Sequence, residues 1–275
     1  MKRNLFKAEA EETMNVIKNG CYTSPSGEVH MIKDQVEYSI HNSILYEPDQ
    51  ISQLPQCPNR AGVIQVTKES TFEACYRLIR KENRDNVTCL NFASGRKPGG
   101  GFLNGAQGQE EMLCRCSCLY STQIIHQKMY QFNQANGSHL YSDYMIYSPN
   151  VVVFRKDNGE FLDDPYQVSI ITAPAPNNTG RNTQEEVNNT MLVRCRKIIH
   201  RAIENRCKVL VLGAFGCGVF RNSPTRVALI FRQLLVDECL GKYFDLIVHP
   251  IFTKRDNDIN YCGFEGVYKD IATFL

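Results

Sequence analysis

Short apolar runs alternate with amphipathic segments along most of the 275-residue chain. Runs of four to eight apolar or β-branched residues are typical of strands buried on both faces. From residue 61 onward, such strands are predicted in AGVIQV, NVTCLNFAS, VVVF, VSIITAPAP, KVLVLGAF and FDLIVHPIF. Amphipathic periodicity predicts helices over about residues 70–83, 109–131, 185–205 and 225–239. This alternation indicates an α/β sandwich whose central sheet is mixed but largely parallel.

Residues 1–60 follow a different pattern. The first 20 residues are rich in helix formers and predict one helix. Between residues 29 and 46, apolar side chains alternate with polar ones, which predicts short strands around a turn. The alternating positions are Val36, Tyr38 and Ile40. We therefore expect residues 1–60 to form an N-terminal accessory extension, packed on a core of residues 61–275 within one structural domain.

Composition and charge exclude several classes of protein. The chain has 31 Lys and Arg against 29 Asp and Glu, a net charge of +2, so no overall positive field favours sequence-specific binding of nucleic acid. No apolar run reaches the roughly 18 residues of a membrane-spanning helix. The 12 cysteines lack paired C-x-x-C spacing and predict packing thiols in a reducing compartment rather than a metal site. We expect a soluble, intracellular monomer, cytoplasmic or nuclear, with no membrane partner.

A glycine-rich segment after the strand NVTCLNFAS is the first candidate for chemistry. It reads PGGGFLNGAQGQEE over residues 98–111, and its three consecutive glycines permit positive φ and close approach of backbone to a ligand. The spacing matches neither a triphosphate-binding P-loop nor G-x-G-x-x-G. Glu110 and Glu111 begin the next helix, where neighbouring side chains point about 100° apart, so one should face the cleft and the other its edge. The structural alternative is a carboxylate pair that only favours the helix dipole.

A second glycine-rich segment, GAFGCGVFRNSP over residues 213–224, follows the strand KVLVL. Its glycines free main-chain amides to bind an anion, and the N-terminus of the next helix adds to the effect. Phe220 could pack against a sugar or base, although core packing is the ordinary role of such a residue. Cys217 would need a base such as His249 to act as a nucleophile, and a small residue in a tight loop is the simpler interpretation. Two such loops at neighbouring strand ends suit a ligand with two adjacent phosphates.

Together the motifs resemble the signature of poly(ADP-ribose) glycohydrolases, which is GGG, seven residues, then QEE. The segments SIITAPAPN, VLVLGAFGCGVFRN and Asn260 to Phe264 extend the resemblance to the short, microbial-type branch, over roughly residues 10–270. The resemblance implies a macrodomain-like α/β/α sandwich with extra N-terminal elements. It also implies hydrolysis of the ribose–ribose O-glycosidic bond of poly(ADP-ribose), with ADP-ribose as the product and ADP-ribosylated macromolecules as partners.

Residue roles follow from the resemblance, position by position. Glu111 matches the catalytic acid/base, Glu110 matches the residue that binds ribose hydroxyls, and Gln109 supports the loop. The positions matched to ribose and diphosphate binding are Asn91, Ser94, Gly99, Gly100, Gly101, Gly216, Cys217, Gly218, Val219 and Phe220. For adenine, the candidate is Val66-Thr67 at the end of an early strand. His249-Pro250 interrupts a terminal strand that is plain apolar in the family.

The implied mechanism requires no cofactor and no metal. Glu111 donates a proton to the leaving oxygen while positive charge develops on the ribose, and it then helps to activate water. Two alternatives remain open at this point. A reader that only binds ADP-ribose needs the glycine loops but not the two glutamates, whereas a mono-ADP-ribosyl hydrolase would share all of these motifs.

Overall fold

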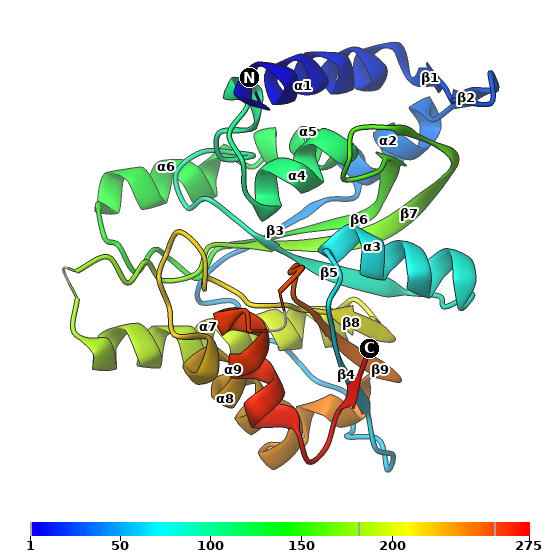
Figure 1. Cartoon of the computed structure of the whole chain (residues 1–275). Helices are drawn as coiled ribbons and strands as arrows, with labels where there is room; N and C mark the ends of the chain where they lie inside the picture. The colour runs from blue at the N-terminus through cyan, green and yellow to red at the C-terminus, as the bar shows by residue number, and fades with distance from the viewer. Residues whose placement is uncertain (1, 181, 256) are drawn as a thin grey trace.

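The structure, a computed structural model, describes residues 2–180, 182–255 and 257–275. Within these ranges its centre is an eight-stranded sheet (Figure 1). The strands are β3 (Ile44–Tyr46), β4 (Val63–Thr67), β5 (Val87–Phe92), β6 (Met145–Arg155), β7 (Phe161–Ala173), β8 (Val209–Val211), β9 (Leu246–Pro250) and β10 (Thr273–Phe274). Their order is β10-β4-β9-β8-β5-β7-β6-β3. Neighbouring strands from β10 to β7 are parallel, whereas β6 is antiparallel to both of its neighbours, β7 and β3. This arrangement confirms the predicted mixed, largely parallel sheet.

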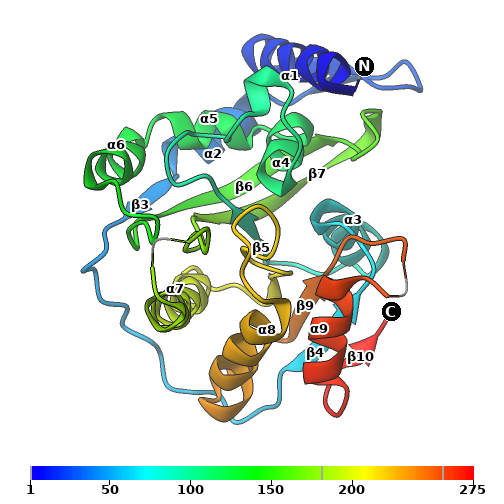
Figure 2. The ribbon, with the colours of Figure 1, turned by 60° about the vertical axis from the view of Figure 1, so that its left-hand side comes forward.

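Helices cover both faces of the sheet, as Figures 1 and 2 show. One layer contains α1 (Lys2–Asn19), α2 (Lys33–His41), α3 (Thr71–Tyr76, continued by a π-helical turn over Arg77–Lys81), α4 (Gln109–Cys116) and α5 (Leu119–Ile124). The other contains α7 (Gln184–Glu204), α8 (Pro224–Arg232, continued over Gln233–Asp237) and α9 (Ile259–Tyr268). α6 (Gln127–Asn136) packs at the β6 edge, and β1 (Cys21–Thr23) pairs with β2 (Val29–Met31) in a small hairpin. No helix in the described ranges is long and apolar enough to cross a membrane.

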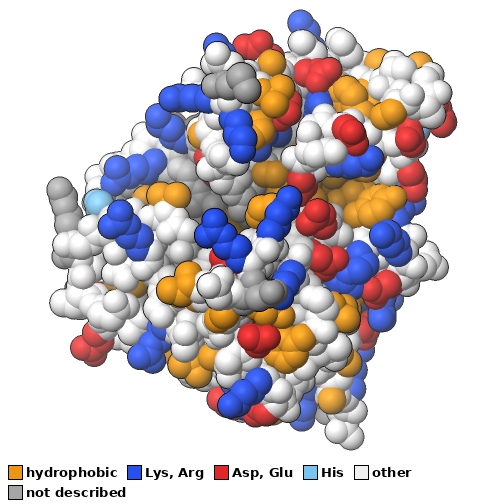
Figure 3. Space-filling view, viewed as in Figure 1, with side chains coloured by type: hydrophobic (Ala, Val, Ile, Leu, Met, Phe, Trp, Pro, Cys, Tyr) orange, Lys and Arg blue, Asp and Glu red, His pale blue; other side chains and the backbone are white. Residues whose placement is uncertain are grey.

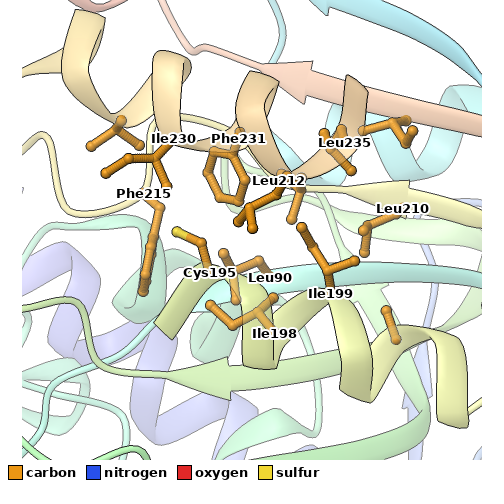
Figure 4. Packing of buried hydrophobic residues seen from close by; sticks show 14 of the residues in the cluster. Leu90, Cys195, Ile198, Ile199, Leu210, Leu212, Phe215, Ile230, Phe231 and Leu235 are labelled. Carbon is orange, nitrogen blue, oxygen red and sulfur yellow. The ribbon is translucent and has the colours of Figure 1, made fainter. Parts of the chain in front are cut away.

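Successive side chains of the central strands point into different helical layers, as the period of a strand requires. In β5, Leu90 belongs to the cluster that contains the inner faces of α7 and α8, whereas Cys89 belongs to the cluster beneath α3 and α4. Figure 4 shows the first cluster, in which Leu90 and Leu212 lie between Ile198 of α7 and Phe231 of α8. This double burial explains why the strands read as continuous apolar runs.

The short strands expected between residues 29 and 46 are present as β2 and β3, but the prediction was wrong for residues 36–40, which form helix α2. Val36 and Ser39 are its buried residues, whereas Tyr38 is exposed on the opposite side. Val36 and Ile40 are four residues apart and pack against the same core cluster, which is a helical spacing. The alternation of three apolar residues was too short to separate a strand from a helix.

The single helix predicted over residues 109–131 is three helices, α4, α5 and α6. Between α4 and α5 the backbone of Ser117 is extended (φ −150°, ψ 178°) and forms an isolated β-bridge with Val153 of β6. The main-chain N–H of Cys118 donates to the carbonyl of Val152 at 3.1 Å. The chain therefore leaves its helical course to pair with the edge of β6, a tertiary contact that the local periodicity does not contain.

Candidate active site

A cavity of about 630 Å³ lies at the carboxyl ends of the parallel strands. Its walls come from the segments after β5, β8 and β9 and from the first turn of α4, and they include Ser94, Glu110, Glu111, Gly216, Phe220 and Phe252. Figure 3 shows Lys and Arg side chains around the hollowed middle of the face seen in Figure 1. The structure thus brings both glycine-rich segments to one cavity.

Gln109 joins the start of α4 to β5 and α3. Its side-chain Oε1 accepts a hydrogen bond from the main-chain N–H of Phe92 at 2.8 Å. Its Nε2 donates to the carbonyl of Leu90 at 2.8 Å and to Oγ1 of Thr71 at 3.1 Å. Gln109 was expected to support the glycine loop. Both ends of its amide instead hold the end of the strand, so its contribution is to place the two following glutamates relative to the sheet.

Glu110 is buried, with 3% of its surface exposed, and receives three hydrogen bonds. Oε1 accepts from Nδ2 of Asn91 at 3.2 Å and from Nε2 of Gln123 at 2.8 Å, and Oε2 accepts from the main-chain N–H of Ser94 at 2.7 Å. Burial raises the pKa of Glu110 to about 8, against the three donors, which lower it, and with a small addition from the charge of Glu111. This carboxyl group is therefore held rigidly and titrates near neutral pH.

Glu111, the next residue, is partly exposed and lines the cavity. Its Oε1 accepts a hydrogen bond from the main-chain N–H of Gly101 at 3.0 Å. A Cβ atom at Gly100 would lie 2.5 Å from Oε1, and one at Gly108 would collide with Oε2. The carboxylate thus occupies space that exists only because both neighbouring residues are glycine. The two glutamates differ in environment as the helical geometry predicted: both line the cavity, but Glu110 is almost fully buried and Glu111 is partly exposed.

The triple glycine contributes to the site in a different way from the one expected. Gly99 and Gly100 have positive φ, +63° and +58°. The N–H of Gly100 donates to the carbonyl of Lys97 at 3.0 Å and that of Gly101 to Glu111, so these amides are already used. Gly99, Gly100 and Gly101 are not among the described residues that line the cavity. They form the tight turn that supports Glu111 from behind.

The loop after β8 presents the free amides. Gly216 has a φ of +74°, and a Cβ there would lie 2.6 Å from that of Ala175. Nδ2 of Asn222 ties the loop together by donating to the carbonyls of Gly216, at 3.0 Å, and Pro176, at 2.8 Å. Within the described part of the chain, the main-chain N–H groups of Gly216, Gly218, Val219 and Phe220 in this loop have no hydrogen-bond acceptor. Such a row of donors is suited to an anion.

Two aromatic rings form the wall between this loop and the segment after β5. The rings of Phe220 and Tyr141 are 5.8 Å apart and inclined at 41°. Tyr141 also covers Gly95, where a Cβ would lie 2.5 Å from the Tyr141 ring. Both rings line the cavity, and Val219 stands at its mouth with 82% of its surface exposed. The wall can therefore contact a sugar held beside the free amides.

Asn91 and Ser94 were both predicted to contact a ribose, and the structure separates them. Asn91 is wholly buried and lies outside the described lining of the cavity, with Nδ2 shared between Glu110 and Oγ1 of Thr172 at 3.1 Å. In this structure its Nδ2 holds Glu110, and a direct contact of Asn91 with ribose stays a prediction. Ser94 lines the cavity, and its Oγ accepts from the N–H groups of Arg96 and Lys97 at 3.2 Å each.

Val66 and Thr67, the candidates for adenine recognition, are fully buried in β4 and are not among the described lining residues. β4 lies between β9 and β10. The apolar pattern did not predict β10. Phe252, with 66% of its surface exposed, and Asn260 line that end of the cavity instead. Phe252 was included in a predicted strand, but β9 ends at Pro250. This proline was the signal in the sequence that the strand ends before Phe252, whose ring is therefore not part of the sheet.

Cys217 and His249 do not form a nucleophile–base pair. Burial raises the pKa of the Cys217 thiol to about 12, and its main-chain N–H already donates to the carbonyl of Ala214. His249 is wholly buried beside the rings of Phe264 and Tyr268, and burial lowers its pKa to about 3. Strand β9 continues through His249 without interruption. Among the described residues, no group of three or more His, Cys, Asp or Glu side chains could hold a metal ion.

Comparisons with known proteins agree with this geometry. A family model described as microbial-type PARG, catalytic domain, matches residues 10–156. The solved poly(ADP-ribose) glycohydrolase (PARG) from Thermomonospora curvata is 36% identical over 96% of this chain and 100% of that chain, with a TM-score of 0.89. The structure of that enzyme bound to the inhibitor ADP-HPD is 38% identical over 96% of this chain and 99% of that chain, with a TM-score of 0.87. PARG from Deinococcus radiodurans in complex with ADP-ribose is 33% identical over 86% of this chain and 98% of that chain, with a TM-score of 0.76. No curated protein matched the sequence.

Proposed function

The chain belongs to the family of microbial-type poly(ADP-ribose) glycohydrolases, and from this premise we propose that it hydrolyses the ribose–ribose bond of poly(ADP-ribose) with Glu111 as the acid/base group. The observation that carries the assignment is the position of the Glu111 carboxylate. It faces the cavity, is oriented by the N–H of Gly101, and shares that cavity with the loop of free amides after β8.

The diphosphate of the terminal ADP-ribose unit is assigned to the loop after β8. Its free N–H groups at Gly216, Gly218, Val219 and Phe220 provide donors to the phosphate oxygens without any side-chain charge. Lys and Arg side chains on the face seen in Figure 3 would favour the approach of a polyanion. The solved relatives with ADP-ribose and ADP-HPD support this class of ligand.

The ribose beside the scissile bond is assigned to the space between Glu110 and the aromatic wall. Glu110 is positioned to form hydrogen bonds with ribose hydroxyls, since its carboxyl oxygens have more lone-pair positions than the three protein donors occupy. The ring of Phe220 packs against the sugar from the side of Tyr141. These contacts place the anomeric carbon within reach of Glu111.

In the reaction, Glu111 protonates the oxygen that leaves with the rest of the polymer while the C–O bond breaks and positive charge develops on the ribose. The negative charge of the bound diphosphate favours the protonated form of a nearby carboxyl group and stabilises the oxocarbenium-like ribose. Glu111, now ionised, takes a proton from the water that attacks the anomeric carbon. Both products then carry complete hydroxyl groups, and Glu111 is returned to its starting form.

The test is incubation of the purified protein with poly(ADP-ribose) and, separately, with mono-ADP-ribosylated protein, followed by chromatography of the products. We expect free ADP-ribose from the polymer. Glu111→Gln should reduce turnover by about 10²–10⁴-fold, because general acid/base catalysis contributes that much, and leave ADP-ribose binding intact. Glu185→Gln is the matched control, since Glu185 is a first-turn glutamate of α7 that is exposed to solvent.

Three outcomes would contradict the proposal. Near-normal turnover by Glu111→Gln would remove Glu111 from the reaction. Release from the mono-ADP-ribosylated protein alone would reassign the substrate. Release from neither, together with a rise in melting temperature on adding ADP-ribose, would indicate a reader.

A further inference from the structure

Gln123 is a buried polar residue outside both glycine-rich motifs. It lies on α5, is wholly buried, and points its amide back at α4. Nε2 donates to Oε1 of Glu110 at 2.8 Å, and Oε1 accepts from Sγ of Cys114 at 3.5 Å. A buried amide is unfavourable unless its polar atoms are paired. Both partners of this amide belong to the helix that carries the two glutamates.

The thiol of Cys114 determines which way the amide faces. Burial raises the pKa of this thiol well above its ordinary value, and the charges of Glu110 and Glu111 act in the same direction, so the group stays protonated. The S–H of a protonated thiol is a weak hydrogen-bond donor, and its sulfur is a weak acceptor. If the amide of Gln123 were reversed, its oxygen would face the Glu110 carboxylate and its NH₂ would face the thiol. Only one orientation therefore satisfies both ends.

We propose that Gln123 is a positioning residue for Glu110 and that Cys114 sets the orientation of Gln123, so that the pair holds the Glu110 carboxylate ready to accept a ribose hydroxyl. The inference rests on the proposed function, in which Glu110 binds the ribose. It extends the site to a helix, α5, that contributes no residue to the described lining of the cavity.

The titration of Glu110 reports on this arrangement. The groups that face it are Glu111 and Cys114 on its own helix and Tyr130 on α6, whose pKa is raised well above its usual value by burial and by the charge of Glu110. The hydrogen bond from Gln123 lowers the pKa of Glu110, whereas burial raises it. Removal of this donor should therefore raise the pKa further, so that less of the carboxylate form is present at neutral pH.

The first experiment compares Gln123→Leu with the wild type and with Gln127→Leu, an exposed glutamine at the start of α6. Glutamate is labelled with ¹³C at the carboxyl carbon, and the Glu110 resonance is identified by its absence in Glu110→Gln. We expect the Glu110 titration midpoint to rise by about one unit in Gln123→Leu only, the size of shift given by one hydrogen bond to a charged group. The Kd for ADP-ribose at pH 7 should increase about tenfold to a hundredfold.

An unchanged midpoint and an unchanged Kd in folded Gln123→Leu would overturn the proposal. Because the midpoint is measured in the free protein, it tests the arrangement even if the protein failed to hydrolyse the polymer, which would refute the proposed function alone. A merely structural role would lower stability without moving the midpoint.

The second experiment does not depend on whether Gln123→Leu folds. Cys114→Ser keeps a hydroxyl donor for Gln123, whereas Cys114→Ala removes it. We expect Cys114→Ser to keep kcat/KM within about twofold of the wild type and Cys114→Ala to lose about threefold to tenfold, the net value of one neutral hydrogen bond. Equal kcat/KM values and equal Glu110 midpoints in the two variants would overturn the role of Cys114 in orienting Gln123.

Discussion

Gly100→Ala tests whether the glycine turn acts by leaving room for Glu111. The new Cβ would lie 2.5 Å from Oε1 of Glu111 and 3.1 Å from Oε2 of Glu110. The first distance is well below van der Waals contact, so the Glu111 carboxylate must move by about 0.5–1 Å. It would then lose its bond from the N–H of Gly101. A displacement of about 1 Å at a reacting group reduces the rate about 100-fold.

The matched control for Gly100→Ala is Gly137→Ala. Gly137 has a φ of +65°, close to the +58° of Gly100, but no atom would lie within 4 Å of its Cβ. Both variants should lose about 1–2 kcal/mol of unfolding free energy, because alanine is strained at positive φ. Urea unfolding measures that common loss, and the rate of ADP-ribose release measures the difference. If Gly100→Ala kept as much activity as Gly137→Ala, the steric account of the glycine turn would be refuted.

Three further predictions concern single groups of the site. The pKa of Glu110 is raised in the folded protein, to about 8, so the stability contributed by its protonated form should be present below about pH 4 and lost as the pH rises to 8. Urea unfolding across this range should show the unfolding free energy of the wild type falling relative to that of Glu110→Gln. Parallel plots of unfolding free energy against pH would contradict the assignment. Cys217→Ala should keep turnover within about twofold, since the thiol stays protonated; a large loss of kcat would restore it as a nucleophile. Phe220→Ala should weaken ADP-ribose binding about tenfold in calorimetry, given what ring packing contributes, and unchanged affinity would remove the ring from the sugar site.

Much of the fold was predictable because its signals are local. The strands β5, β8 and β9 are short apolar runs, and α3 begins after Ser70, whose side chain accepts from the N–H of Glu73 in a capping box. The turns at the two glycine-rich segments were predictable because glycine adopts positive φ more readily than other residues do. Gly100 and Gly216 both have positive φ in the structure. Helical geometry already requires the side chains of the two adjacent glutamates to point in different directions.

Which residues of the site contact one another depends on contacts between distant segments of the chain. Asn91 was expected to meet a ligand, but Thr172 and Glu110 enclose it. Gln123 carries no motif and reaches Glu110 only because the chain breaks its helix to pair with β6.

The amino-acid sequence by itself determined where the chain turns, which strands are buried and which two carboxylates begin α4, since each of these depends on neighbours a few residues away. Tertiary structure alone decided which amides stay free, which carboxyl group is enclosed and which aromatic rings reach the cavity. Hydrogen-bond partners and burial come from residues far apart along the chain, such as Glu110 and Asn91 or Phe220 and Tyr141. No local pattern contains them, because they exist only once the layers have packed.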